Sequence, residues 1–447
     1  MKNLFNTAII TSLKQTFSKS SSSKKATILL PSLLFSGFFL KTVKKAYLGP
    51  KPEFSPDDKR LLVNLPRLED LEEGEMKEVK WGVQDGQSIL VVKYQGTLHA
   101  LSNHCPHYGA PLHTGVLIDN VLKCPWHGAS FDIISGKTDI SPAIDDLPIY
   151  KVEKADNGDN YVILQDKTDV KTFITPQMSK RDPNDKRRFV IIGGGPAGLS
   201  AAETLRQANY TGEILIISKD SELPYDRTVL SKWVPENVTK IHLRSEEFLK
   251  EYDIDIRINL SVDAIDNKNR IIKLADGTEV AFDKLLIATG SNVFKPKIAG
   301  ADKPHVYTLR TYSDLEQLSK QAKDTKNIVI VGGGFIGLET TAMLKKLSPE
   351  ATITVVDGFE TPFYNTLGKE VGSALQNFHE NKGIKFELKK NVVKITDNSV
   401  ELTDGSSLQA DLVLMATGVV PNSVNIHKFN IFLFAILFLS YNAIVYF

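Results

Sequence analysis

Four side chains that can bind metal occur in two matched groups. Cys105 and His107 are separated by one residue, Cys124 and His127 by two, and these are the only cysteines among the 447 residues. Thiolates and imidazoles are the usual ligands of zinc and of iron–sulfur clusters. A disulfide between the thiols would leave both histidines unexplained, so the pattern predicts a metal centre.

Two kinds of metal centre fit these residue types. A zinc site needs both groups on one tetrahedral ion, but its ligands are usually separated by two residues or more, and Cys105 and His107 are closer. In a Rieske [2Fe–2S] centre, two histidines replace two cysteines on one iron. Each loop then gives its cysteine to one iron and its histidine to the other. The spacing favours the Rieske centre over zinc and over a chance grouping, and His104 and His113 are interpreted as structural or surface residues.

Two glycine-rich motifs predict nucleotide binding. GGGPAG (residues 193–198) and GGGFIG (residues 332–337) each follow a short β-branched strand and begin a segment that can be helical. Glycines allow a sharp turn and let a dinucleotide pyrophosphate approach the backbone, where the helix N-terminus binds it. Tight turns without a ligand are the alternative. The predicted phosphate-binding positions are Gly193, Gly195, Gly198, Gly332, Gly334 and Gly337.

The two motifs belong to an internal repeat. An acid follows the second strand of each copy, Asp220 in the first and Asp357 in the second, where it is expected to hold ribose hydroxyls. Each copy also has an Asp-Gly pair ahead of an Ala-Thr-Gly segment, at residues 288–290 and 416–418. We therefore expect two tandem mononucleotide-type units.

The elements that position these residues change in kind at a charged linker. Residues 60–168 contain short alternating strands between turn-forming pairs, which predicts an all-β domain. Residues 169–187 are interpreted as a linker, and strands, glycine loops and helices then alternate. The expected fold class is multidomain: an all-β Rieske domain, two α/β Rossmann-like units at 188–312 and 313–425, and an apolar tail at 426–447.

Composition and charge exclude several classes of protein. The chain is 42% hydrophobic and 24% charged with a net charge of +1, so it lacks the basic excess of a nucleic-acid binder. Residues 1–25 are basic, acid-free, serine-rich and amphipathic, which predicts a mitochondrial targeting segment. Residues 26–48 are a candidate membrane anchor, although their uncharged run is shorter than about 20 residues. A signal-anchor for another membrane, a disordered tail and a cytoplasmic location are the alternatives.

The segments LPYDRTVLSK (residues 223–232) and LLIATG (residues 285–290) resemble the FAD domain of ferredoxin-reductase-like and apoptosis-inducing-factor-like flavoproteins. That family usually has prolines where this chain has Thr228 and Val229. GGGFIGLE (residues 332–339) is similar to the family's NAD motif, and the acid Asp357 favours NADH over NADPH. The resemblance implies flavin contacts and catalytic roles for Arg227 and Lys232, and cofactor contacts for Thr289, Gly290, Glu339 and Gly418.

The order of domains resembles the Rieske-containing members of the apoptosis-inducing-factor-like oxidoreductases. It implies that NADH reduces FAD, which passes electrons to one [2Fe–2S] cluster and then to an unidentified acceptor. No cysteine occurs from residue 188 onward, so the flavoprotein half has no dithiol of its own. A redox-sensing or death-signalling protein with slow turnover is the alternative, and the oligomeric state stays open.

Two further expectations follow from comparison with that family. The family's chain normally returns to the FAD sheet after the segment ATGVVPN (residues 416–422), whereas here an uncharged run, residues 429–447, comes next. This run is either a tail anchor or an abnormal terminus. A further functional alternative is a form of the protein that keeps the cluster but binds FAD substoichiometrically. High-potential Rieske proteins resemble one another in an extra disulfide and two hydroxyl side chains, where this chain has Ala129 and Phe131. We therefore expect a low cluster potential.

Overall fold

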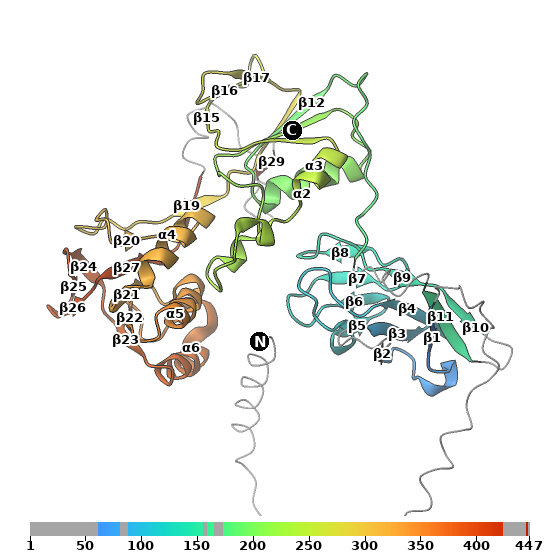
Figure 1. Ribbon diagram of the computed structural model, residues 1–447, viewed down its shortest axis with the longest axis horizontal. Helices are drawn as coiled ribbons and strands as arrows, with labels where there is room; N and C mark the ends of the chain where they lie inside the picture. The colour runs from blue at the N-terminus through green and yellow to red at the C-terminus, as the bar shows by residue number, and fades with distance from the viewer. Residues whose placement is uncertain (1–60, 81–87, 155–158, 165–172, 423–443, 446–447) are drawn as a thin grey trace, which may run out of the picture.

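The computed structural model describes residues 61–80, 88–154, 159–164, 173–422 and 444–445. The expected targeting segment, the expected anchor and all but two residues of the apolar tail lie outside these ranges. Figure 1 shows an all-β domain followed by two units that combine sheets with helices. Within the described part of the chain, no helix has the length and apolar character needed to cross a bilayer.

The first domain is built from three small antiparallel sheets, with the orders β1-β11-β10, β2-β3-β4-β9 and β5-β6-β7-β8. Alternate residues of its strands point into two apolar cores, and the longest strand, β3, is buried over most of its length. Its strands are β1 (Leu61–Asn64), β2 (Met76–Lys80), β3 (Ser88–Tyr94), β4 (Thr97–Ser102), β5 (Val116–Ile118), β6 (Val121–Lys123), β7 (Ser130–Asp132), β8 (Thr138–Ile140), β9 (Ile149–Tyr150), β10 (Val152–Lys154) and β11 (Asn160–Leu164), with short 3-10 turns η1 (Leu68–Asp70) and η2 (Leu112–Thr114).

The second body has a parallel sheet of order β14-β13-β12-β18 with an antiparallel three-stranded sheet beside it, β15-β16-β17. The strand β12 is a buried β-branched run, and helix α2 begins directly after its glycine loop with Pro196 in the first turn, where proline is favourable. Its elements are β12 (Arg188–Ile192), α2 (Pro196–Gln207), β13 (Glu213–Ile217), η3 (Arg227–Val229), η4 (Val238–Ile241), α3 (Glu246–Glu251), β14 (Ile254–Arg257), β15 (Val262–Asp266), β16 (Ile271–Leu274), β17 (Glu279–Ala281) and β18 (Lys284–Ile287).

The third body repeats this design, with a parallel sheet of order β20-β27-β21-β22-β23 and an antiparallel sheet β24-β25-β26. Strand β20 lies ahead of residue 313, the expected start of the unit. The fold thus confirms the predicted tandem α/β units. Its elements are β20 (Val306–Tyr307), α4 (Tyr312–Ala322), β21 (Asn327–Val331), α5 (Phe335–Leu347), β22 (Thr352–Asp357), α6 (Tyr364–Glu380), β23 (Ile384–Leu388), β24 (Val392–Ile395), β25 (Ser399–Leu402), β26 (Ser407–Gln409) and β27 (Leu412–Met415).

Two strand pairings connect distant parts of the chain. Strands β19 (Ser291–Val293) and β28 (Val419–Pro421) follow the two Ala-Thr-Gly segments and pair antiparallel between the second and third bodies. Strand β29 (Ile444–Val445), which lies in the run expected to be a tail anchor or an abnormal terminus, pairs antiparallel with β18 at the edge of the second body's sheet.

The described part of the expected linker, residues 173–187, has no helix and only one isolated bridge. That bridge joins Ile174 to Asp146 of the first domain. Further on, the backbone of Ser179 donates to the carbonyl of Arg206, whose buried guanidinium in turn bonds four backbone carbonyls. The segment therefore packs along the second body instead of standing away from it.

Candidate functional site

The two cysteine loops have the same backbone design. In each loop the cysteine N–H donates to the carbonyl five residues later, and a glycine N–H donates back to the cysteine carbonyl, at 2.8–3.2 Å. Gly109 and Gly128 have φ values of +71° and +76°, a conformation that side chains disfavour. One loop follows β4 and the other follows β6, so strands of two different sheets bring them together.

The structure brings the four predicted ligands together as one pair of cysteines and one pair of histidines. Cys105 and Cys124 are buried, and a hydrogen bond from Cys105 lowers the pKa of the Cys124 thiol to about 6 while the pKa of Cys105 rises. The Nδ1 atoms of His107 and His127 lie 3.2 Å apart. Burial and then the charge of His127 lower the pKa of His107, which favours the neutral imidazole that binds metal.

This arrangement fits a cluster better than a single zinc ion. Two imidazole nitrogens that bind one ion at about 2.1 Å with tetrahedral geometry lie about 3.4 Å apart, close to the spacing of the Nδ1 pair. Within the described residues, no group of three or more His, Cys, Asp or Glu side chains could hold one metal ion. Two ligands per iron, cysteines on one and histidines on the other, account for the paired geometry.

His104 and His113 are not part of the group of four predicted ligands. The backbone N–H of His113 donates to the Asn103 side chain, which also contacts the His113 ring at 3.0 Å. His104 forms an isolated bridge with Pro111, and its buried Nε2 atom has no partner. The structural or surface role expected for these two histidines stays a prediction.

The first glycine motif has the geometry of a dinucleotide cradle. A Cβ atom at Gly193 would lie 2.1 Å from the Ala288 carbonyl oxygen, and one at Gly198 would lie 2.0 Å from that of Gly193. At Gly195, by contrast, a Cβ would meet nothing within 4 Å. The outer glycines therefore permit close backbone packing, whereas the middle one leaves open space at the N-terminus of α2, where a pyrophosphate would bind.

The second motif repeats this geometry position by position. A Cβ at Gly332 would lie 2.5 Å from the carbonyl oxygen of Ala416, one at Gly337 would lie 2.1 Å from that of Gly332, and Gly334 is again open. Both cradles fit the nucleotide cofactors that the sequence implied. The two copies of the repeat therefore share their packing contacts as well as their sequence motif.

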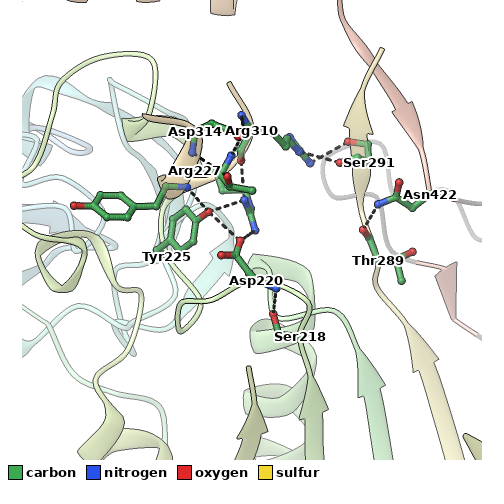
Figure 2. A network of polar contacts seen from close by, with 11 residues as sticks. Ser218, Asp220, Tyr225, Arg227, Thr289, Ser291, Arg310, Asp314 and Asn422 are labelled. Atoms are coloured by element: carbon green, nitrogen blue, oxygen red, sulfur yellow. Dashed lines mark hydrogen bonds and ion pairs between the residues drawn. The ribbon is translucent and has the colours of Figure 1, made fainter. Parts of the chain in front are cut away.

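The predicted residue Asp220 is engaged by other side chains of the second body. Its carboxylate accepts hydrogen bonds from Arg227 at 2.7 Å and from the Tyr225 hydroxyl at 3.0 Å (Figure 2). It lies three residues beyond the end of β13, at the carboxyl edge of the parallel sheet. Arg227 also donates to the carbonyl of Arg310 at 2.7 Å, so Asp220 orients this arginine. The ribose contact expected of Asp220 stays a prediction.

Sequence reasoning missed Arg310 and Ser291 as neighbours of this site. Arg310 donates to the Ser291 hydroxyl at 2.9 Å and to its carbonyl at 3.0 Å (Figure 2). Burial first, and then the charge of Arg227, lower the pKa of Arg310. Nearby, Asn422 donates to the carbonyl of Thr289 at 2.8 Å. No motif identifies Arg310 in advance, because only the fold brings residues 291 and 310 together.

Lys232 and Glu339 lie at the junction of the two α/β units. Lys232 Nζ is 2.8 Å from Glu339 Oε2, which also accepts from the Ser231 hydroxyl. In the other unit, the Asp357 carboxylate accepts from the backbone N–H of Gly333 at 2.5 Å and of Phe359 at 2.9 Å. The structure thus brings Glu339 to the predicted flavin residue Lys232, whereas Asp357 stays beside its own glycine loop.

One large cavity of about 2810 Å³ connects the predicted metal-binding loops with the second body. His107 and His127 of the all-β domain line it, as do Gly195 and Lys232 of the α/β fold. Predicted ligand histidines and predicted flavin residues therefore face the same space.

Comparison with protein families identifies both halves. Residues 62–151 match the Rieske [2Fe-2S] domain, and residues 187–433, more than half of the chain, match the pyridine nucleotide-disulphide oxidoreductase family. The chain belongs to the pyridine nucleotide-disulphide oxidoreductase family. These matches confirm the predicted fold class and the predicted [2Fe–2S], FAD and NAD(H) cofactors.

Individual members of this oxidoreductase family are similar over different lengths. Apoptosis-inducing factor 3 of Mus musculus is 34% identical over 83% of this chain, which spans 62% of that relative. The 3-phenylpropionate/cinnamic acid dioxygenase ferredoxin–NAD(+) reductase component of Photorhabdus laumondii is 34% identical over 52% of this chain and 59% of its own length. The crystal structure of the ferredoxin reductase for the CYP199A2 system from Rhodopseudomonas palustris has a TM-score of 0.52, with 30% identity over 54% of this chain and 61% of that one.

Proposed function

We propose that this protein passes electrons from NADH through FAD to its Rieske cluster and on to a separate one-electron acceptor. Bound FAD would supply a two-electron centre that accepts a hydride from NADH, equivalent to two electrons and one proton. It would pass the electrons one at a time to the cluster and release the proton to solvent. The observation that carries this proposal is the common cavity lined by both ligand histidines and by the flavin-unit residues.

The chain's own residues have distinct tasks in this scheme. The N–H groups at the start of α2 would bind the FAD pyrophosphate beside open Gly195. Arg227 and Lys232 place positive charge where negative charge develops on the reduced cofactor. Asp220 and Glu339 hold these two cations in position through ion pairs of 2.7 Å and 2.8 Å.

NADH is favoured as the donor because of the acid in the second unit. The Asp357 carboxylate stands at the end of β22 beside the open glycine cradle, where a ribose is expected. A 2′-phosphate there would meet a carboxylate already held by two backbone N–H groups. The Photorhabdus relative, whose name records a ferredoxin–NAD(+) reductase, supports this preference.

Anaerobic mixing of the cofactor-loaded full chain with NADH tests the electron path. We expect the flavin absorbance to bleach first and the cluster absorbance to change in a second phase. A cluster that stays oxidised while the flavin is fully reduced would refute the proposed path. Turnover with an artificial acceptor below about one per second, slow beside ordinary enzymes, would instead favour the redox-sensing alternative.

We also propose a mitochondrial, membrane-associated location. The support is the basic, acid-free sequence of residues 1–25 and the uncharged run that follows it. Deletion of residues 1–48 should release a protein that keeps its cluster into the soluble fraction. If the shortened protein still sediments with membranes, the N-terminal segment is not the anchor.

A further inference from the structure

Tyr108 links the cluster loops to the second body. It directly follows the ligand His107, and its ring packs against the rings of His107 and His127, with centroid distances of 4.2 Å and 5.8 Å. Its hydroxyl donates a hydrogen bond to the Asp226 carboxylate, 118 residues further along the chain. Asp226 itself immediately precedes Arg227. The Tyr108 side chain therefore reaches from the histidine pair to the segment that carries the predicted flavin residue Arg227.

The acceptor of this bond is held in place by a residue that departs from the family pattern. Asp226 Oδ1 accepts from the Thr228 N–H at 2.9 Å and from its hydroxyl at 2.7 Å. This leaves Oδ2 for Tyr108. The proline usual at position 228 has no N–H and no hydroxyl, so it could make neither bond. Thr228 therefore supplies two donors that orient Asp226 toward the cluster loop.

A second contact fixes the same two bodies to each other. Arg244 Nη2 lies 2.8 Å from Asp145 of the all-β domain and 2.9 Å from Glu203 of α2. All three side chains are more than nine-tenths buried. Separating a buried charge from its partners costs several kcal/mol. This triad therefore favours the one relative orientation of the two bodies in which its three side chains meet.

We propose that Tyr108 is a positioning residue for electron transfer between flavin and cluster, with the Asp226–Thr228 pair as its docking site and the Arg244 triad as a second anchor. The proposal rests on the proposed function. Tyr108 would act by holding the histidine side of the cluster toward the flavin cavity. Electron transfer slows with distance, so a loosened contact would slow only the step between the two centres.

The test uses Tyr108→Phe in the cofactor-loaded full chain, because this change removes the hydroxyl and keeps the ring. The matched control is Tyr94→Phe, since, among the residues that the structure describes, the Tyr94 hydroxyl hydrogen-bonds only the exposed Gln95 side chain. For Tyr108→Phe we expect cluster reduction by NADH to slow about fivefold. This factor corresponds to the loss of one partly exposed hydrogen bond to a charged group. Flavin reduction and the cluster midpoint potential should stay as in the control.

A readout without NADH follows docking directly. Hydrogen–deuterium exchange of residues 105–110 and 224–232 should rise in Tyr108→Phe and stay unchanged in the control. Thr228→Pro, a second variant, should lower the ratio of cluster-reduction to flavin-reduction rate. Adding Tyr108→Phe to it should then give little further loss, since both changes break one contact.

Three results would overturn the positioning role: an unchanged cluster-reduction rate, a shifted midpoint potential that accounts for the slower rate, or additive losses in the double variant. Failure of the proposed function looks different. In that case NADH leaves the cluster of the unmodified protein oxidised, while the exchange data still report whether Tyr108 docks.

Discussion

Lys232 and Glu339 form an ion pair of 2.8 Å between the two nucleotide-binding units. Both side chains line the large cavity shared with the cluster loops, so we expect Lys232→Met to slow flavin reduction by NADH about tenfold. The loss of a buried oxyanion donor slows a reaction about a hundredfold or more, and the effect here is smaller because Lys232 is half exposed. Stopped-flow bleaching of the flavin measures this. Lys250→Met, which breaks the exposed Lys250–Glu246 pair on α3, is the control and should leave the rate unchanged.

The surroundings of the cluster set its potential. Ala129 and Phe131 are fully buried behind the second cysteine loop, and neither side chain can donate a hydrogen bond. Since such bonds raise Rieske potentials, we expect a midpoint near the low end of the range of about −150 to +300 mV. Ala129→Ser should raise the midpoint in a potentiometric titration. A value above about +100 mV for the unmodified protein would contradict the expectation.

The Arg244 triad is expected to dominate the stability of the contact between the bodies. Arg244→Ala leaves two carboxylates buried without their cation, which should cost about 3–5 kcal/mol. Thermal unfolding, monitored through flavin release and the cluster spectrum, should show this loss of stability as a lower midpoint of the first transition. Lys273→Ala removes a lysine from an exposed pair with Glu279 in the second body, and this control should change that transition little.

Two histidines should make the folded state less stable in mild acid. Burial lowers the pKa of both His242 and His379, so each stays neutral in the folded chain while the unfolded chain binds a proton below its pKa of about 6.5. Their effect is absent above that pH and grows as the pH falls toward the lower folded pKa. Denaturation between pH 7 and 5 should therefore show declining stability, and His379→Gln should flatten the decline. A slope that this change leaves untouched would exclude His379.

Much of the site could be predicted because its residues are close in sequence. The ligand loops and the glycine motifs each lie within a few residues, and their chemistry requires particular residue types. The position of Asp357 beside Gly333 likewise follows from the strand order of a repeated unit.

The contacts between bodies could not be predicted in the same way. Arg244 looks like an ordinary surface charge in the sequence, and only the fold brings Asp145, 99 residues earlier, within hydrogen-bond distance of it. The engagement of Asp220 by Arg227 was missed for a related reason. The tertiary structure decides which of several nearby partners an acidic side chain takes, and residue spacing does not.

The antiparallel pair β19 and β28 means that the two nucleotide-binding units cannot be cut apart cleanly. Ser291 pairs with Pro421 and Val293 with Val419, so each unit ends in a strand whose hydrogen-bonding partner belongs to the other. A fragment made from either unit alone would carry an unpaired edge next to its own Ala-Thr-Gly segment. The smallest piece of this oxidoreductase that can be expressed with both edges satisfied is therefore the pair, and fragments of one unit should aggregate.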